Sequence, residues 1–321
     1  MLRIGDCLKT LDIVTSAYNE EKCLPELYRR LTEVLSQEKD YTWRLLVADN
    51  CSTDKTWQVI KALSRQDPRV LGFRMSRNFT LDEAFTAGID RATADAVVIM
   101  CSDLQDPPEV IPLFLRQYEL GFEQVLAKIV KRGSVPPLRR FLSHFYYFIA
   151  NKLTNNQIPR GVSDFRLVTK NVYDSVRLMQ ERHRFMRGLF AWTGFKTSII
   201  EIERPERFAG ESQFMKASLL KAVQWSVFGL FSNSTKPLSL ISYFGLASSV
   251  ISFLLTAISS IIWLTLGVPF AGFGTIVGLV SIGFSILFLF IGIISQYLAL
   301  MFEELKRRPI YIVAETTNGK H

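Results

Sequence analysis

Charged side chains are absent from one long stretch of this chain. No Asp, Glu, Lys or Arg occurs from Pro237 to Phe302, although the 321 residues include 38 Lys and Arg and 30 Asp and Glu. A single membrane span takes about 20 apolar residues, so the stretch is long enough for two spans and too long for one. Turn-forming residues at 267–274 divide it. The sequence therefore predicts a two-helix transmembrane hairpin at about 238–266 and 275–300. The alternative is a pair of buried helices in a large soluble core, for which the rest of the chain has no matching apolar surface.

Positive charge flanks this stretch but is missing from its central turn. Lys216, Lys221 and Lys236 precede it, and a Lys-Arg-Arg run at 306–308 follows it. Lys and Arg accumulate on the cytoplasmic side of membrane helices, so we expect both termini to be cytoplasmic. The first residues of the chain also lack the apolar core of a signal peptide. We therefore expect the domain before the hairpin to stay in the cytoplasm.

Cysteine is scarce, and its spacing excludes two kinds of site. The four cysteines show neither metal-type pairs nor the Cys-x-x-Cys spacing of redox proteins, so they are predicted to be free thiols. The basic residues are dispersed and match no nucleic-acid-binding signature, so we expect no nucleic acid partner despite the net charge of +8. That charge instead suits anionic lipid headgroups and phosphates.

Apolar strand-like runs alternate with amphipathic helical patterns before the hairpin. The predicted strands are 11–17, 43–48, 70–75, 96–100 and 125–129, and the predicted helices between them are 21–35, 54–64, 81–92 and 109–118. This alternation predicts an α/β fold with a Rossmann-like, mostly parallel sheet that carries helices on both faces. The pattern is too short and irregular for an eight-fold barrel, and no internal repeat is visible.

Composition divides the chain into four parts. We expect an α/β domain at 1–213, an amphipathic juxtamembrane helix at 214–236, the hairpin at 237–302 and a basic cytoplasmic tail at 303–321. The second part mixes lysines with large apolar residues, which suits a helix lying on a membrane surface. An aromatic-rich segment at 141–148, which follows several cations, fits either such a surface helix or the protein core.

Polar residues follow three of the predicted strands. The first strand ends in Tyr-Asn-Glu-Glu at 18–21, the second in Asp-Asn-Cys-Ser-Thr-Asp at 49–54, and the fourth leads to Asp-Leu-Gln-Asp-Pro-Pro-Glu at 103–109. Open α/β sheets bind ligands beyond the carboxyl ends of their strands, and hard oxygen donors there suit a divalent cation carrying phosphate. These loops therefore predict a site for a nucleotide diphosphate. Alternatively, Asp106 or Glu109 simply caps the helix that follows.

These segments resemble the ordered motifs of a known enzyme family. Ser-Ala-Tyr-Asn-Glu at 16–20, the segments 49–54 and 103–109, Ser-Arg-Asn-Phe at 76–79 and Ser-Asp-Phe-Arg-Leu at 163–167 are similar to those of inverting family-2 glycosyltransferases. The closer similarity is to the polyisoprenyl-phosphate subgroup, which includes dolichol-phosphate mannose synthases and bactoprenol glucosyltransferases. Segments at 186–192, 204–214 and 304–311 extend it to nearly the whole chain. The resemblance implies a GT-A-type fold before the hairpin, in a multi-pass protein of the bacterial inner membrane.

The resemblance also implies roles for individual residues. Asp103 and Gln105 would carry Mg²⁺ or Mn²⁺, and Asp103 and Asp164 would be catalytic, with Asp164 facing the acceptor. The residues that would bind the nucleotide-sugar donor are Ala17, Tyr18, Glu20, Asp49, Asn50, Asp103, Leu104 and Gln105. Those that would bind the acceptor phosphate are Lys128, Arg132, Arg140, Arg166, Arg204, Arg207 and Ser212. Guanidinium groups suit that role because they form bidentate bonds with phosphate oxygens.

Two of these assignments have structural alternatives. The carboxylate of Asp164 could pair with Arg166 or another cation for stability alone. Arg204 and Arg207 stand beside acidic residues and could form a solvated salt-bridge face.

The reaction implied is a single in-line displacement with inversion. A polyprenyl phosphate, undecaprenyl phosphate in bacteria, would attack the anomeric carbon of UDP-glucose or another UDP-hexose. The lipid-linked sugar would then serve the modification of cell-surface polysaccharide such as O-antigen. Membrane lipid is a further expected partner, and the uncharged spans, rich in Gly, Ser and Ala, suit packing into homo-oligomers.

The sequence departs from the family pattern at several positions. Cys101 stands where the family has the first residue of an Asp-x-Asp pair, Thr-Leu-Asp at 80–82 replaces Gly-Lys-Glu, and Gln213 stands where Lys is common. A thiol is a soft donor, poorly matched to Mg²⁺, so we expect a changed donor or weaker metal dependence. Two alternatives are a non-catalytic protein that binds nucleotide-sugar or lipid phosphate, and a processive polysaccharide synthase.

Overall fold

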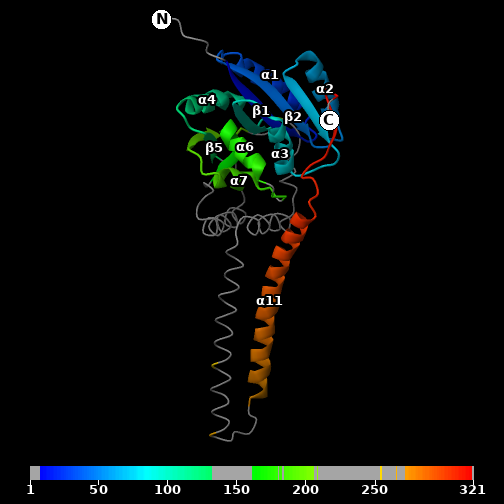
Figure 1. Ribbon diagram of the computed structural model, residues 1–321, viewed down its shortest axis with the longest axis vertical. Coiled ribbons are helices and arrows are strands. Elements are labelled where there is room, and N and C mark those ends of the chain that lie inside the picture. The colour runs from blue at the N-terminus through cyan, green and yellow to red at the C-terminus, as the bar shows by residue number, and fades with distance from the viewer. Residues whose placement is uncertain are drawn as a thin grey trace.

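The computed structural model describes residues 8–131, 161–179, 181–182, 184–205, 208, 254, 265 and 272–319. The predicted juxtamembrane helix at 214–236 and almost all of the first predicted span at 238–266 lie outside these residues. Four of the predicted acceptor-binding residues also lie outside them: Arg132, Arg140, Arg207 and Ser212. The described residues form an α/β domain and one long helix that extends from it (Figure 1).

Eight strands of the described chain form one sheet, in the order β7-β5-β6-β4-β1-β2-β3-β8. They are β1 (Lys9–Ala17), β2 (Tyr41–Asp49), β3 (Val70–Met75), β4 (Ala96–Cys101), β5 (Gln124–Lys131), β6 (Val162–Thr169), β7 (Thr197–Glu203) and β8 (Val313–Thr316). The central strands β4, β1, β2 and β3 are mutually parallel, and β5 is parallel to β7. Strand β6 is antiparallel to β4 and β5, and β8 is antiparallel to β3. The predicted mostly parallel sheet is therefore confirmed.

Helices follow most of the strands. They are α1 (Cys23–Leu35), α2 (Thr56–Gln66), α3 (Leu81–Arg91), the short 3₁₀ helix η1 (Pro108–Val110), α4 (Ile111–Glu119), α6 (Lys170–Leu178), α7 (Met186–Trp192) and α11 (Phe273–Leu305). Sequence explains the start of α3, where Thr80 and Glu83 form a capping box that satisfies the first free N–H groups. In α1, buried leucines at 24, 27, 31 and 35 recur at helical spacing and turn one face toward the sheet.

Apolar side chains cover both faces of the sheet. Strand β4 shows this most clearly: Ala96, Val98 and Met100 belong to one buried cluster, whereas Val97 and Ile99 belong to the other. The first cluster includes buried residues of α1, α2 and α4, and the second includes those of α3, α6 and α7. A strand buried on both faces reads as a continuous apolar run, which is why β4 was visible in the sequence. The domain has three layers, and the polar ends of its central strands open at one edge.

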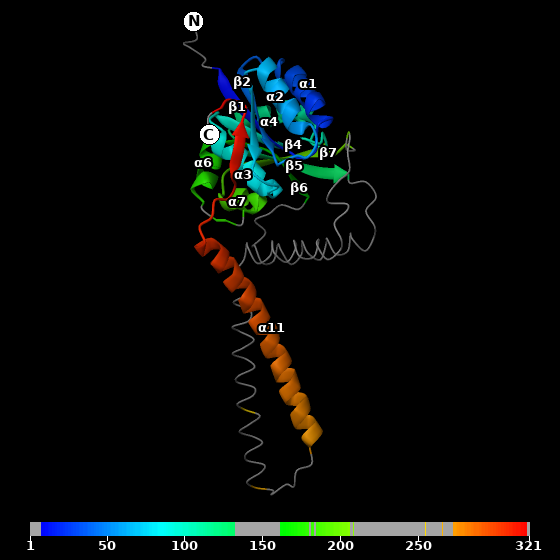
Figure 2. The ribbon, with the colours of Figure 1, turned by 90° about the vertical axis from the view of Figure 1, so that its right-hand side faces the viewer.

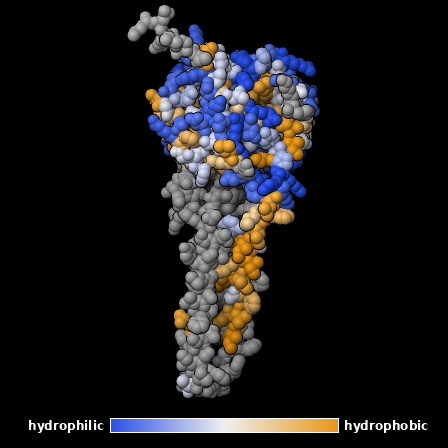
Figure 3. Space-filling model, in the orientation of Figure 1, coloured by the Kyte–Doolittle hydropathy of each residue, from blue (hydrophilic) through white to orange (hydrophobic). Residues whose placement is uncertain are grey.

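Helix α11 projects away from the sheet domain as a single long rod (Figures 1 and 2). The side chains described along it are mostly apolar and exposed (Figure 3), among them Ile276, Leu287, Ile294 and Leu298. Within the described residues, no helix is both long and apolar enough to cross a membrane. The predicted hairpin is thus not found in the described residues: its second helix falls within α11, and its first lies almost wholly outside them.

After α11 the chain returns to the sheet domain. Strand β8 adds to the free edge of β3, where the N–H of Ser76 donates to the carbonyl of Ile312 at 2.9 Å. Farther along, Trp57 Nε1 donates to Glu315 Oε2 at 2.8 Å. Part of the tail predicted at 303–321, the strand Val313–Thr316, is therefore paired with the sheet. Figure 2 shows β8 beside the central strands.

Candidate active site

Three loops meet at the carboxyl edge of the central strands. Strand register places Ala17 at the end of β1 opposite Asp49 at the end of β2, and Ser16 opposite Cys101 at the end of β4. The predicted loops at 18–21, 49–54 and 103–109 therefore start side by side. Ser102 fastens two of them because its hydroxyl donates to the carbonyl of Ser16 at 2.8 Å.

The first two loops are held together by side-chain to backbone hydrogen bonds. The N–H of Thr53 donates to Asn19 Oδ1 at 2.8 Å, and the N–H of Glu20 donates to Thr56 Oγ1 at 2.8 Å. Asp49 is fully buried, and its Oδ1 accepts the N–H of Ser52 at 3.1 Å. Its Oδ2 lies 3.2 Å from Arg74 Nε but has no hydrogen-bond partner among the described residues. Burial raises the pKa of Asp49 despite that cation.

Asn50 holds the segment that leads into α3. Its Nδ2 donates to the carbonyl of Phe79 at 2.7 Å, and its Oδ1 accepts the N–H of the same residue at 2.7 Å. Both polar atoms of this amide are therefore used within the protein. Asn50 was predicted to bind the donor. In the structure its side chain links the second loop to the residues that lead into α3.

The third loop turns sharply after β4. Leu104 has φ of 62°, and Asp103 Oδ1 accepts the N–H of Gln105 at 3.1 Å. Asp106 does not cap the following helix: its Oδ2 accepts the N–H of Cys101 at 3.0 Å, and its Oδ1 lies 3.3 Å from Arg204 Nη2. Burial raises the pKa of Asp106 to about 6 and raises the pKa of the Cys101 thiol well above its usual value.

Asp164 lies on the antiparallel strand β6, next to the same edge. Its carboxylate pairs with Arg187 of α7, whose Nε and Nη2 donate to Oδ1 and Oδ2 at 2.6 Å each. One alternative for Asp164 was an ion pair with Arg166 or another cation, and the structure contains such a pair, with Arg187. Although burial opposes ionisation, the guanidinium groups of Arg187, Arg166 and Arg204 lower the pKa of Asp164.

Arg166 is turned toward the protein rather than toward solvent. Its Nε and Nη2 donate to the carbonyls of Asp164 and Ser163 at 3.2 Å each, and the guanidinium lies 5.0 Å from the ring centre of Phe190. Burial lowers its pKa to about 10. Arg166 therefore stays a cation at neutral pH and adds positive electrostatic potential to the site.

Other predicted acceptor-binding residues have different surroundings. Lys128 donates to Glu201 Oε1 at 2.7 Å in an exposed ion pair between β5 and β7. Arg204 contacts Asp106, and its Nε is buried without a hydrogen-bond partner among the described residues. Of the described members of this set, Arg166 and Arg204 lower the pKa of Asp164 through their charges.

Sequence reasoning missed two charged residues at this site. Arg187 belongs to the 186–192 segment, but nothing in its spacing linked it to Asp164. Asp82, in the first turn of α3, is influenced by the charges of Asp164, Arg187 and Arg166. The signal that could have found it was its place in the Thr-Leu-Asp segment that departs from the family pattern.

The donor atoms of the third loop can be tested for a divalent cation. No group of three or more His, Cys, Asp or Glu that could hold a metal occurs in the part of the chain that the structure describes. Mg²⁺ bound with a substrate needs only one or two carboxylates, because phosphate oxygens and water complete its shell. Asp103 with the amide of Gln105 fits a cation that arrives with a diphosphate, and does not fit a permanent protein cage.

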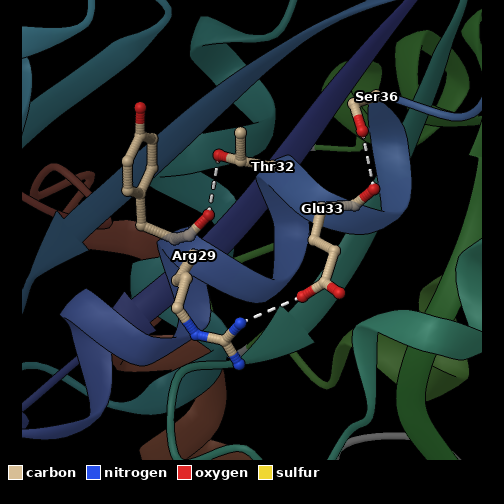
Figure 4. A pocket seen from close by; sticks show the side chains of 5 residues that line it. Arg29, Thr32, Glu33 and Ser36 are labelled. Carbon is tan, nitrogen blue, oxygen red and sulfur yellow. Dashed lines mark hydrogen bonds and ion pairs between the residues drawn. The ribbon is translucent and has the colours of Figure 1, made fainter.

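A shallow hollow elsewhere on the surface is not a competing site. It lies on α1 (Figure 4) and is lined by Tyr28, Arg29, Thr32, Glu33 and Ser36. Its polar groups are paired with one another: Arg29 Nη1 with Glu33 at 3.0 Å, and Thr32 and Ser36 with backbone carbonyls at 2.8 Å. These internal pairs leave the hollow little to offer a ligand.

The chain is similar to known proteins over most of its length. The family model described as "Glycosyl transferase family 2" matches residues 12–177, which include the three loops and Asp164. A bactoprenol glucosyl transferase of Shigella phage SfII is 35% identical over 313 residues, which cover 96% of this chain and 99% of the relative. A prophage bactoprenol glucosyl transferase homolog of Escherichia coli (strain K12) is 35% identical over 94% of this chain and 98% of its own. An uncharacterized glycosyltransferase of Bacillus subtilis (strain 168), YkcC, is 34% identical over 95% of this chain and 93% of its own.

Proposed function

Since the chain belongs to glycosyl transferase family 2 and is a glycosyltransferase, we propose that it moves a hexose from a nucleotide-sugar to a polyprenyl phosphate. The observation that carries this proposal is the combination of the three strand-end loops with relatives named bactoprenol glucosyl transferase that match nearly the whole chain. The acceptor we propose is undecaprenyl phosphate.

The donor we propose is UDP-glucose. The names of the relatives support the glucose, and two features support a nucleotide beside Asp49 and Asp103. Oδ2 of buried Asp49 makes no hydrogen bond among the described residues, and beside its ion pair with Arg74 it suits an N–H of a base. A divalent cation held by Asp103 and Gln105 would neutralise the charge that grows on the departing diphosphate.

The proposed reaction does not need a strong general base. A phosphate monoester is ionised near neutral pH, so its oxygen can attack the anomeric carbon directly, in line with the departing diphosphate and with inversion. Asp164 would then help to position the acceptor rather than abstract a proton. The unpaired Nε of Arg204 supplies a donor for phosphate beside it.

We further propose that the enzyme is anchored in the bacterial cytoplasmic membrane with the sheet domain and both termini on the cytoplasmic side. The long row of exposed apolar side chains on α11 supports this placement, because a surface of that size is covered by lipid or by another protein. The lipid-linked sugar would serve the modification of cell-surface polysaccharide, and homo-oligomers would form through the apolar helices.

One observation favours a second candidate function. Burial and the nearby carboxylates raise the pKa of the Cys101 thiol, and this residue stands where the family has a carboxylate. A protein with a single carboxylate at this point could bind nucleotide-sugar without turning it over.

The deciding experiment is transfer of radiolabelled sugar from a panel of nucleotide-sugars to undecaprenyl phosphate by the full chain in detergent. The expected result is transfer from UDP-glucose that requires Mg²⁺ or Mn²⁺ and falls by about 100-fold or more in Asp103→Ala. Asp40→Asn, at an exposed turn, serves as the matched control. Binding of UDP-glucose without transfer from any donor would support the second candidate instead.

A further inference from the structure

Asp164, Arg187 and Asp82 form a charged group built from three elements. Asp164 comes from β6, Arg187 from α7 and Asp82 from the first turn of α3. Arg187 pairs with Asp164 through two hydrogen bonds of 2.6 Å. The charges of Asp164, Arg187 and Arg166 act on the pKa of Asp82. Helix α3 also contacts the start of α7, where Thr86 Oγ1 donates to Met186 Sδ at 3.6 Å. The charge of one guanidinium thus acts on two carboxylates.

Of the two arginines that contact Asp164, Arg187 is the more accessible. Its side chain is 31% exposed, whereas Arg166 is 3% exposed and donates to backbone carbonyls. A bound ligand could therefore reach Arg187 without disturbing the fold. A guanidinium binds phosphate and carboxylate through the same two-pronged geometry, so one can replace the other.

The position of Arg187 also fits an acceptor that comes from a membrane. The loop before α7 contacts the end of α11: the N–H of Arg182 donates to Glu304 Oε1 at 2.8 Å, and Arg182 Nη1 donates to the carbonyl of Arg308 at 3.2 Å. Arg187 is therefore close along the chain to the junction between the sheet domain and its long apolar helix.

We propose that Arg187 binds the acceptor phosphate by exchanging the carboxylate of Asp164 for it, and that Asp82 takes up a proton from solvent when this exchange occurs. This inference rests on the proposed function, since it names the residue that recognises the acceptor at the same site. A phosphate monoester carries about −1.5 to −2 charges at pH 7 against −1 for a carboxylate, which favours the exchange.

The charges around Asp82 explain why it should take up a proton when the acceptor binds. Burial raises its pKa to about 7, the charge of Asp164 raises it as well, and Arg187 and Arg166 lower it. When Arg187 turns to a phosphate, its charge acts less on the two carboxylates, and an anion is added nearby. Both changes raise the pKa of Asp82 further, so Asp82 holds its proton more tightly in the bound state than in the free enzyme. Acceptor binding should therefore weaken as the pH rises above 7.

Steady-state kinetics on the full chain in detergent test the role of Arg187. We expect Arg187→Gln to raise the KM for undecaprenyl phosphate by about 10- to 100-fold, with the KM for UDP-glucose unchanged within about twofold. Arg187→Lys keeps the positive charge but loses the bidentate geometry of the guanidinium, so its KM for undecaprenyl phosphate should lie between those of the wild type and Arg187→Gln. Arg29→Gln, on exposed α1, is the matched control and should leave both constants unchanged.

A purely structural role would give a different pattern. If Arg187 acted only by holding Asp164, kcat would fall while the KM for the acceptor stayed constant, and the inference would be overturned. Thermal unfolding of each variant checks the fold. If Arg187→Gln fails to fold, Arg187→Lys, which keeps an ion pair with Asp164, decides between the two patterns.

The pH profile tests Asp82. Above pH 7 the acceptor KM of the wild type, divided by that of Asp82→Asn, should rise by up to about tenfold per pH unit, the slope of one proton. Ionisation of the phosphate itself affects both proteins equally and cancels in this ratio. A ratio that is constant from pH 6 to 9 would overturn the part assigned to Asp82.

Binding measurements separate this inference from the proposed function. Isothermal titration compares a short-chain prenyl phosphate, the matching prenyl alcohol and inorganic phosphate. If the wild type neither binds the prenyl phosphate nor transfers sugar to undecaprenyl phosphate, the proposed function fails. If the wild type does both and Arg187→Gln binds equally well, only the inference fails. Inorganic phosphate bound as tightly as the prenyl phosphate would contradict a lipid acceptor at Arg187.

Discussion

Four described residues other than glycine adopt left-handed backbone conformations, and three of them lie just beyond a central strand. These three are Asn19 with φ of 58°, Cys51 with φ of 60° and Leu104 with φ of 62°, after β1, β2 and β4. A side chain in this region costs about 1–2 kcal/mol except in asparagine or aspartate, which tolerate it better. Such strain concentrates at functional sites, so its repetition at all three loops supports the assignment of this edge as the active site.

Cys51 allows this strain to be measured. We expect Cys51→Gly to stabilise the protein by about 1 kcal/mol, because glycine adopts positive φ freely, and Cys51→Val to destabilise it by about 1–2 kcal/mol. Chemical denaturation of the purified protein provides the comparison. Cys51→Ser keeps the size and the backbone cost, so it should match the wild type. Equal stabilities for the glycine and valine variants would show that no strain is stored there.

Packing of α3 against β1 positions the segment that begins with Asp82. Gly88 allows the close approach: a Cβ added there would lie 2.3 Å from Val14 Cγ1, and Val14 is fully buried. A contact that short cannot exist, so the helix must lie against the strand through glycine. The distance between α3 and the sheet depends on Gly88, and so does the position of Asp82 relative to Asp164.

Replacement of Gly88 should therefore disturb the whole element. We expect Gly88→Ala to destabilise the protein by about 1–3 kcal/mol, since an extra methyl group overpacks the core. In a Val14→Ala background the same change should cost little, because the conflicting methyl group is gone. A double-mutant cycle measured by denaturation tests this coupling. Additive effects would contradict the close contact.

Sequence predicted the elements that local pattern determines. Strands β1 to β5 were found within two residues at each end because they are apolar runs with polar ends. Strands β6, β7 and β8 were not predicted. Strand β7 alternates between exposed and half-buried residues at one edge of the sheet, and β8 has four residues whose partner, β3, lies far earlier in the chain. Neither property leaves a local signal.

The site was predicted to a similar depth. The three loops could be placed together because parallel strands end at one edge, a rule that needs no coordinates. The partner of Asp164 could not be predicted, because Arg187 lies 23 positions later in the sequence and the contact depends on how α7 lies against β6. The roles assigned to the donor-binding and acceptor-binding residues remain predictions.

At the scale of the whole molecule, the chain leaves the sheet domain, forms α11 and comes back. Residues after α11 are fastened at several points: Tyr311 Oη donates to Asp90 Oδ2 at 3.0 Å, β8 pairs with β3, and the N–H of Thr317 donates to the carbonyl of Gly72 at 2.9 Å. Strand β3 also carries Arg74, which pairs with Asp49 at the candidate donor site. The tail thus supports the site from the sheet edge.

Truncation should reveal this support. We expect a chain that stops after Pro309 to unfold at a temperature several degrees lower than the full chain, and to bind UDP more weakly, because the edge of β3 loses its hydrogen-bonded partner. A chain that stops after Asn318 keeps β8 and serves as the control. Differential scanning fluorimetry and UDP titration measure the two effects. Identical behaviour of both truncated chains would show that β8 contributes nothing.

The return of β8 to the sheet also constrains how many times the chain can traverse a bilayer. A strand cannot pair with β3 from the opposite side of a membrane, so β7 and β8 must lie in the same compartment. The number of crossings between them is therefore even, whatever its value. If α11 crosses, a second crossing must accompany it, and a variant with one extra span inserted before α11 could not complete its sheet.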